Sequence, residues 1–154
     1  MGELGYDYSG CRILVVGGTR GAGWSTAQAF REFGADVVVT GTHYLTTFYE
    51  ADLAGLTYRQ LDLTDPDQIQ DFADRLGPID VLVNAAGSRL PYGAAGPEQE
   101  FIVQAARLGL AGPLFLANKL RGRLASSPAG GGGAVINLPG TRAWWELGQE
   151  VTDL

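Results

Sequence analysis

The chain has 154 residues, 45% of them hydrophobic, which suits one domain with a single buried core. Its formal net charge of −6 leaves no basic surface for a polyanion, so we expect neither nucleic acid nor an anionic membrane as a partner. One cysteine and one histidine exclude an internal disulfide and a structural metal site, and the lack of a signal-peptide or membrane-length apolar pattern makes the cytoplasm the expected location.

Two buried strands with a helix between them are predicted in the first part of the chain. Residues 12–16 form a short apolar run that ends at paired glycines, as expected of a strand buried on both sheet faces. Apolar residues recur at helical spacing over 24–33, and Gly34 is suited to the helix C-terminus. Residues 37–40 repeat the buried-strand pattern, which Gly41 ends.

The middle of the chain is less regular. Residues 43–56 carry a weak helical pattern, and residues 57–61 are predicted as a third strand. Asp65 is expected to cap a helix that begins at Pro66, with Gln68 as the reciprocal capping side chain. The apolar stripe of this helix consists of Ile69, Phe72, Ala73 and Leu76.

Two further strands and a long helical region are predicted in the last part. Residues 79–84 and 134–138 read as strands, and residues 97–124 as helix with a bend at Gly112-Pro113. The glycine run at 130–133 stands where a helix-to-strand loop is due.

The alternation of strands and helices predicts the fold class. Strands that follow helices throughout require right-handed crossovers and a parallel sheet. We therefore expect one doubly wound, Rossmann-type α/β domain over residues 1–154, with strand order 3-2-1-4-5 and a ligand at the switch point between the first and fourth strands.

A glycine-rich loop lies between the first strand and the first helix. Gly17 allows a tight turn, Gly21 lets the backbone approach a pyrophosphate, and Gly23 lets helix and strand pack closely. The N–H groups that begin the helix would meet the anion. Glycines also serve ordinary turns, so the loop alone leaves both interpretations open. The loop residues that we predict to bind a dinucleotide are Gly17, Thr19, Arg20, Gly21, Ala22 and Gly23.

This loop resembles that of the short-chain dehydrogenase/reductases, which reads Thr-Gly-x-x-x-Gly-x-Gly; Val16 replaces the threonine. In that family an aspartate after the third strand binds the adenine amino group, and the resemblance assigns this place to Asp62, followed by Leu63. A solvated residue beside a helix cap is the alternative. The third match is to the family's Asn-Asn-Ala-Gly motif, which lies beside the cofactor. Here the motif reads Asn84-Ala85-Ala86-Gly87.

The end of the second strand indicates the choice of cofactor. A carboxylate there would bind the adenosine ribose of NAD, but the sequence reads Thr40-Gly41-Thr42-His43. Arg20 stands where related NADP-preferring reductases often carry a basic residue. We therefore expect NADP(H), with its 2′-phosphate held by Arg20 and Thr42; His43 is as readily an ordinary loop residue.

The resemblance implies an oxidoreductase that acts on a carbonyl or alcohol group of a small molecule, but the family's catalytic residues are not matched. Gly109 stands at the place of the asparagine and Gly140 at that of the serine, and no Tyr-x-x-x-Lys occurs. Lys119 is expected to be a surface charge. Tyr92, which follows Ser88 and Arg89, is our candidate for a substitute phenol.

Two hypotheses follow from these losses. In the first, the family's C-terminal elements, absent here, lie beyond residue 154 with any tyrosine and lysine. In the second, the chain binds the dinucleotide without hydride transfer, as a regulatory subunit, a scaffold or a redox-neutral biosynthetic enzyme. An uncovered fifth strand, followed by Trp144 and Trp145, predicts missing chain or a homo-oligomer.

Overall fold

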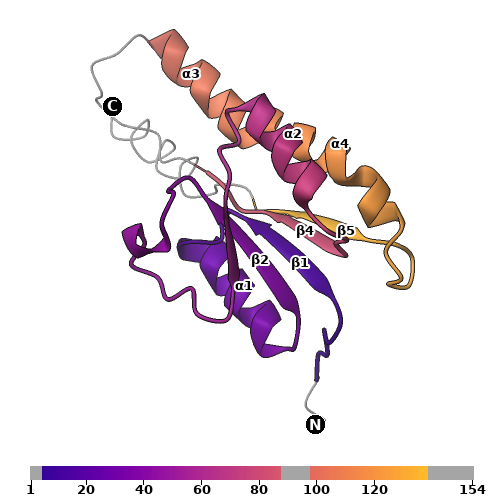
Figure 1. Ribbon diagram of the computed structural model, residues 1–154. Coiled ribbons are helices and arrows are strands. Elements are labelled where there is room, and N and C mark those ends of the chain that lie inside the picture. Colours follow the sequence, from indigo (N-terminus) through magenta and orange to yellow (C-terminus); the bar gives the residue numbers. More distant parts are fainter. Residues whose placement is uncertain (1–4, 88–97, 139–154) are drawn as a thin grey trace, which may run out of the picture.

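In the computed structural model, which describes residues 5–87 and 98–138, five parallel strands form one sheet (Figure 1). Its order, β3-β2-β1-β4-β5, confirms the predicted topology, and β1 pairs with both β2 and β4 at the centre. The strands are β1 (Arg12–Val16), β2 (Asp36–Gly41), β3 (Thr57–Gln60), β4 (Val81–Asn84) and β5 (Ala134–Asn137).

Helices cover both faces of the sheet. Figure 1 shows α1 on one face, with α2 and α4 side by side on the other. The helices are α1 (Gly21–Glu32), α2 (Pro66–Arg75), α3 (Glu98–Ala106) and α4 (Gly112–Ala125), with a 3-10 turn η1 (Thr46–Phe48) and a π-helical turn η2 (Arg107–Ala111).

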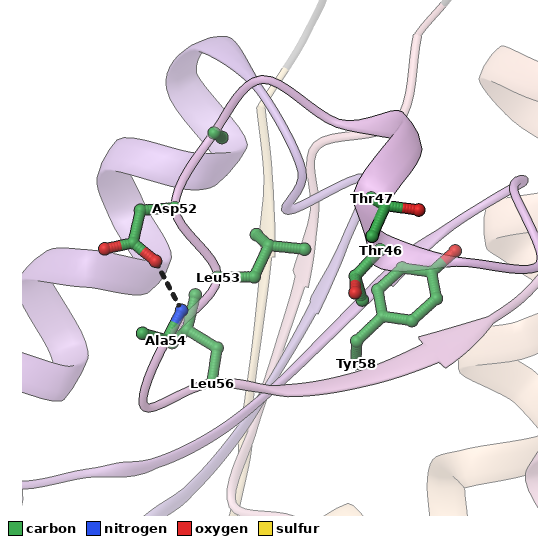
Figure 2. A pocket seen from close by; sticks show the side chains of 8 residues that line it. Thr46, Thr47, Asp52, Leu53, Ala54, Leu56 and Tyr58 are labelled. Carbon is green, nitrogen blue, oxygen red and sulfur yellow. Dashed lines mark hydrogen bonds between the residues drawn. The ribbon is translucent and has the colours of Figure 1, made fainter.

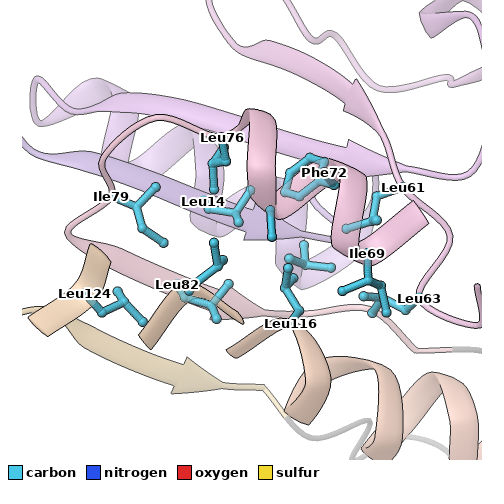
Figure 3. Close-up of a cluster of buried hydrophobic side chains, with 13 residues drawn as sticks. Leu14, Leu61, Leu63, Ile69, Phe72, Leu76, Ile79, Leu82, Leu116 and Leu124 are labelled. Atoms are coloured by element: carbon cyan, nitrogen blue, oxygen red, sulfur yellow. The ribbon is translucent and has the colours of Figure 1, made fainter. Parts of the chain in front are cut away.

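The central strand β1 supplies both cores because successive side chains of a strand point to opposite faces. Leu14 and Val16 pack with Leu82, α2 and α4 in the larger cluster (Figure 3). Ile13 and Val15 enter the smaller cluster beneath α1. These four of the five β1 side chains are buried, each contributing about 1.5–3 kcal/mol, so this strand anchors the loop that follows it.

The predicted cap of α2 is confirmed in one half and wrong in the other. The Asp65 carboxylate accepts hydrogen bonds from the N–H groups of Asp67 and Gln68, at 3.0 and 3.2 Å. The Gln68 side chain, however, accepts from the N–H of Asp62 at 3.1 Å rather than from that of Asp65. The Asp65 N–H already donates to the Asp62 carbonyl, so the glutamine bridges to the previous turn instead.

The weak helical pattern of residues 43–56 was a wrong prediction, since only η1 is helical there. The rest of the segment docks on α1 through the Asp52 carbonyl, which accepts from Trp24 Nε1 at 2.9 Å and from Gln28 Nε2 at 3.1 Å. Side chains of α1 thus satisfy backbone that a helix would have satisfied internally.

The long helical region is interrupted just before the predicted bend. Pro113 has no N–H, and its ring would crowd the carbonyl four residues earlier, at Gly109. The wider π turn η2 ends directly before this point and α4 begins at Gly112. A side chain at Gly112 would strike the Leu63 carbonyl, so this glycine allows α4 to pack against the loop after β3.

All four residues of β5 are exposed, with 45% of the Val135 surface open. The predicted cover from Trp144 and Trp145 lies outside the described residues. Homo-oligomer formation stays a prediction.

Candidate functional site

The glycine loop is shaped by close backbone approaches. Gly17 has φ +77°, and a Cβ there would lie 2.7 Å from the Ala86 backbone. A Cβ at Gly23 would strike the Gly17 carbonyl and come within 3.0 Å of the Ala85 side chain. The tight turn expected of Gly17 and the close packing expected of Gly23 are therefore both present, and Ala85 and Ala86 serve as packing partners of the loop.

Gly21 differs from these two glycines. Its φ is +55°, but a Cβ there would meet no atom of the described residues within 4 Å. Glycine is needed here because of this backbone conformation and because a side chain would occupy the open space in front of the loop, where a ligand can approach.

The N-terminus of α1 is open to an anion. Arg20, its N-cap, makes no side-chain capping bond, and the first turn carries no acidic residue. The first N–H groups of a helix have no partner within the helix, and together with the helix dipole they stabilise a negative charge. Gly21 and Ala22, which begin the helix, are exposed. This arrangement can hold one or two phosphate groups without any acidic competitor.

The end of β2 lies directly beside the glycine loop. The Gly17 N–H donates to Thr40 Oγ1 at 3.3 Å, and a Cβ at Gly41 would lie 3.0 Å from the Thr19 methyl group. Thr19 is 6% exposed, so its side chain is packed inside the protein. A nucleotide with its phosphates at α1 would extend its sugar across this end of β2.

Two residues predicted for the 2′-phosphate, Arg20 and Thr42, are both exposed at this edge. The His43 ring packs between Phe48 and Tyr49, with centroids 5.4 and 5.1 Å away. Sequence reasoning left His43 open and missed Tyr49, because the two lie in an irregular segment without periodicity.

The residues predicted for the adenine follow β3. One Asp62 carboxylate oxygen accepts from Thr64 N at 2.8 Å and Thr64 Oγ1 at 2.7 Å, which shapes the turn before α2. Leu63 is buried in the larger core cluster, so its side chain packs. This turn is consistent with the alternative interpretation of Asp62 as a local structural residue.

Asn84 carries an unpartnered atom at the end of β4. It is 8% exposed; its amide donates to Asn137 Oδ1 at 2.8 Å, and its own Oδ1 is buried with no hydrogen-bond partner among the described residues. Leaving a buried acceptor unsatisfied costs about 1–3 kcal/mol, which points to a donor from outside this part of the chain. Sequence reasoning missed Asn137 as a partner, although the two asparagines end neighbouring strands in register.

Other predicted residues are spread more widely. Gly87 is exposed, and a Cβ there would meet no atom of the described residues within 4 Å. Lys119 is exposed on α4 over the Phe115 ring, as expected of a surface charge. Gly109 lies exposed in η2. Tyr92, Ser88, Arg89 and Gly140 lie outside the described residues.

A separate crevice of about 440 Å³ opens between β3 and the segment before it (Figure 2). Thr46, Thr47 and Tyr58 line one side, and Leu53 projects into the middle. The Asp52 carboxylate accepts from the Ala54 N–H at 2.9 Å, so it is engaged locally. None of the residues predicted to bind the dinucleotide lines this crevice.

Within residues 5–87 and 98–138, no three His, Cys, Asp or Glu side chains gather to hold a metal ion. Over the same ranges, no helix is both long and apolar enough to cross a membrane.

The comparisons with known proteins agree with this geometry. A family model described as "short chain dehydrogenase" matches residues 12–141. The chain is 31% identical to "Short chain dehydrogenase/reductase dpchG" of Colletotrichum higginsianum, over 94% of this chain and 58% of that protein.

Solved structures match as well. A "short chain dehydrogenase/reductase family protein" superposes with a TM-score of 0.74 at 28% identity, over 94% of this chain and 65% of the other. The Pseudomonas aeruginosa RhlG/NADP active-site complex gives a TM-score of 0.73 at 23% identity, over 86% and 56%. Some relatives match nearly all of this chain, and the chain then spans about three fifths of their length.

Proposed function

The chain belongs to the short-chain dehydrogenase family, oxidoreductases that bind a nicotinamide dinucleotide, and from this premise we propose that it holds NADP(H) for a reaction between a carbonyl and an alcohol. The observation that carries the proposal is the glycine loop: an uncapped helix N-terminus, free of acidic residues, behind the open space at Gly21. A pyrophosphate fits this place because the helix N–H groups would satisfy its charge.

The remaining residues fit the rest of a dinucleotide. Arg20 and Thr42 would hold the 2′-phosphate, and Asp62 the adenine. Asn84, whose buried Oδ1 has no donor among the described residues, and Gly87 would border the nicotinamide ribose. When bound, the nicotinamide would supply or accept a hydride. The protein's part is to orient the two ends of the dinucleotide across the carboxyl ends of β1, β2 and β4.

The preference for NADP(H) over NAD(H) rests on charge. No acidic residue occurs from Thr40 to Tyr49, so nothing in that stretch would repel a 2′-phosphate. The Arg20 side chain is exposed at the start of α1, where a guanidinium can pair with phosphate oxygens. The substrate is proposed only as a small carbonyl or alcohol compound, and Tyr92 is kept as the candidate proton donor.

The test is a titration of the chain with NADPH and NADH, followed by quenching of tryptophan fluorescence. We expect micromolar binding with a preference for NADPH. Gly21→Ala, which places a methyl group in the open space at a cost of about 1–2 kcal/mol in backbone strain, is expected to abolish binding of both nucleotides while the fold persists.

Gly10→Ala, at another glycine with a positive φ of +81° and open space among the described residues, but before β1 at the opposite end of that strand, is the matched control and should bind as the parent chain does. Failure of the parent chain to bind either nucleotide would overturn the proposal. Equal affinities for NADPH and NADH would overturn the preference alone. For Tyr92, loss of turnover in Tyr92→Phe with cofactor binding retained would support its role, and unchanged turnover would remove it.

A further inference from the structure

Two tyrosines and the backbone N–H and C=O groups of one residue, His43, form a closed hydrogen-bonded ring at the end of β2. The His43 N–H donates to the Tyr49 hydroxyl at 2.9 Å, the two tyrosine hydroxyls are 3.1 Å apart, and the Tyr58 hydroxyl donates to the His43 carbonyl. Each hydroxyl has one proton. Since Tyr58 uses its proton on His43, Tyr49 must donate to Tyr58, and the ring runs in one direction.

The surroundings keep this ring intact at neutral pH. Both tyrosines are half-buried, and their rings pack with centroids 5.6 Å apart. Burial raises the pKa of the Tyr58 phenol above its usual value, and its interaction with the neighbouring Tyr49 acts in the same direction. Tyr58 therefore stays protonated and available as a donor, and the ring strengthens each of its bonds.

The ring fixes the loop that begins at Gly41. A Cβ at Gly41 would strike the Tyr49 hydroxyl, so this glycine is what allows the phenol to lie against the backbone. The next carbonyl, that of Thr42, accepts from Gln60 Nε2 at 2.9 Å, and the Gly41 carbonyl accepts from the Leu61 N–H at 2.8 Å. Side chains and backbone at β3 thus hold consecutive peptides of the loop.

We propose that Tyr49 and Tyr58, here called the tyrosine clamp, are positioning residues that hold Thr42 in place for the 2′-phosphate of an adenine nucleotide. The inference rests on the proposed function and goes beyond it, because it assigns the selectivity to two residues that do not themselves touch the ligand. A Cβ at Gly41 would lie 3.0 Å from the methyl group of Thr19, so the clamped loop lies beside the glycine loop, where the sugar would lie.

The clamp acts by preorganisation. A loop that is already ordered loses less conformational entropy when the phosphate binds, and that saving appears as affinity. A ligand without the 2′-phosphate does not use Thr42 in this way, so its affinity should be nearly independent of the clamp. This difference separates a positioning role from a general contribution to folding.

The experiment measures the affinity of two probes, 2′,5′-ADP and 5′-AMP, by calorimetry with the full chain. Tyr58→Phe removes one hydroxyl from the ring and should weaken 2′,5′-ADP binding about threefold to tenfold, the value of one hydrogen bond. Binding of 5′-AMP should change less than twofold. Tyr44→Phe is the control, since Tyr44 lies in the same segment with 80% of its surface exposed.

A double-mutant cycle tests the route of the effect. If the clamp acts through Thr42, Tyr58→Phe should have little further effect in a Thr42→Ala background. Tyr49→Phe is the second variant; it should also weaken 2′,5′-ADP binding and speed hydrogen exchange of the His43 amide in the ligand-free chain, measured by NMR.

Equal weakening of both probes, or no weakening in either tyrosine variant, would overturn the clamp while leaving the proposed function standing. If the parent chain binds neither 2′,5′-ADP nor NADPH, both the proposed function and the role of the clamp are contradicted. Unchanged His43 exchange in Tyr49→Phe would show that the ring does not hold the loop, and would also overturn the inference.

Discussion

The side-chain amide of Asn84 donates to the side-chain oxygen of Asn137 over 2.8 Å, and this bond ties β4 to β5 at the carboxyl end of the sheet. Asn137→Ala removes the acceptor from a buried amide, which should lower the free energy of unfolding by about 1–3 kcal/mol. Urea denaturation measures the change. Asn137→Asp keeps an acceptor oxygen and should lose less; equal losses in both variants would contradict the assigned role of this bond.

Asp80 should make stability depend on acid pH. It is buried just before β4; its carboxylate accepts from the Arg12 N–H at 2.8 Å and from the Ser127 hydroxyl. The Ser127 bond, the Arg12 N–H and the Arg12 charge hold the pKa of Asp80 below its usual value, against the opposing effect of burial. A lowered folded-state pKa stabilises the protein above the unfolded value of about 3.9, and this contribution is lost as the pH falls below it.

Removal of the serine hydroxyl tests this dependence. Ser127→Ala should lower the free energy of unfolding by about 1.5–3 kcal/mol at pH 7, because it loses a bond to a charged group as well as the bond that the Ala129 N–H donates to the Ser127 hydroxyl. The difference from the parent chain should shrink between pH 4 and the folded-state pKa, as followed by urea denaturation at several pH values. Ser126→Ala, which loses only a bond to the Gly122 carbonyl, should show a pH-independent difference; a flat Ser127→Ala profile would contradict the prediction.

Two glycines of α4 should respond in opposite directions to the same substitution. A Cβ at Gly112 would strike the Leu63 carbonyl, so Gly112→Ala should lower the melting temperature. Gly122 has open space, so Gly122→Ala should stabilise by about 0.4–1 kcal/mol, because it reduces the entropy of the unfolded chain. Thermal unfolding followed by circular dichroism measures both; a stabilised Gly112→Ala would show that α4 can move away from the loop after β3.

Arg20 should distinguish the two cofactors. If its guanidinium pairs with the 2′-phosphate, Arg20→Gln should weaken NADPH binding about tenfold and leave NADH binding nearly unchanged. The loss should diminish at high salt because Arg20 is exposed. Arg31→Gln, at the other end of α1, is the control in the same fluorescence titration. Equal losses for NADPH and NADH would place Arg20 away from the 2′-phosphate.

The order of the strands and the roles of the loop glycines followed from the sequence because both depend on local pattern. Buried strands of β-branched residues, ended by glycine, have a period and a length that identify them one at a time. Right-handed crossovers then leave few possible orders for the sheet. Gly17 and Gly23 were interpretable for the same reason, since a turn between β1 and α1 permits few backbone paths.

Where the sequence misled, the deciding contacts came from distant residues. Most of residues 43–56 are not helical, because the Trp24 and Gln28 side chains of α1 bind the Asp52 carbonyl. The Gln68 side chain accepts from the Asp62 N–H, because the Asp65 N–H already donates to another acceptor, the Asp62 carbonyl.

The sequence by itself thus determined the fold class, the strand order and the place of the glycine loop, all properties of segments close together in the chain. Only the tertiary structure decided which polar groups pair and which stay open: that Asn84 donates to Asn137, and that Tyr49 and Tyr58 close a ring on His43. Hydrogen bonds depend on distances of a few tenths of an ångström, which periodicity does not specify and which packing of the sheet against its helices sets.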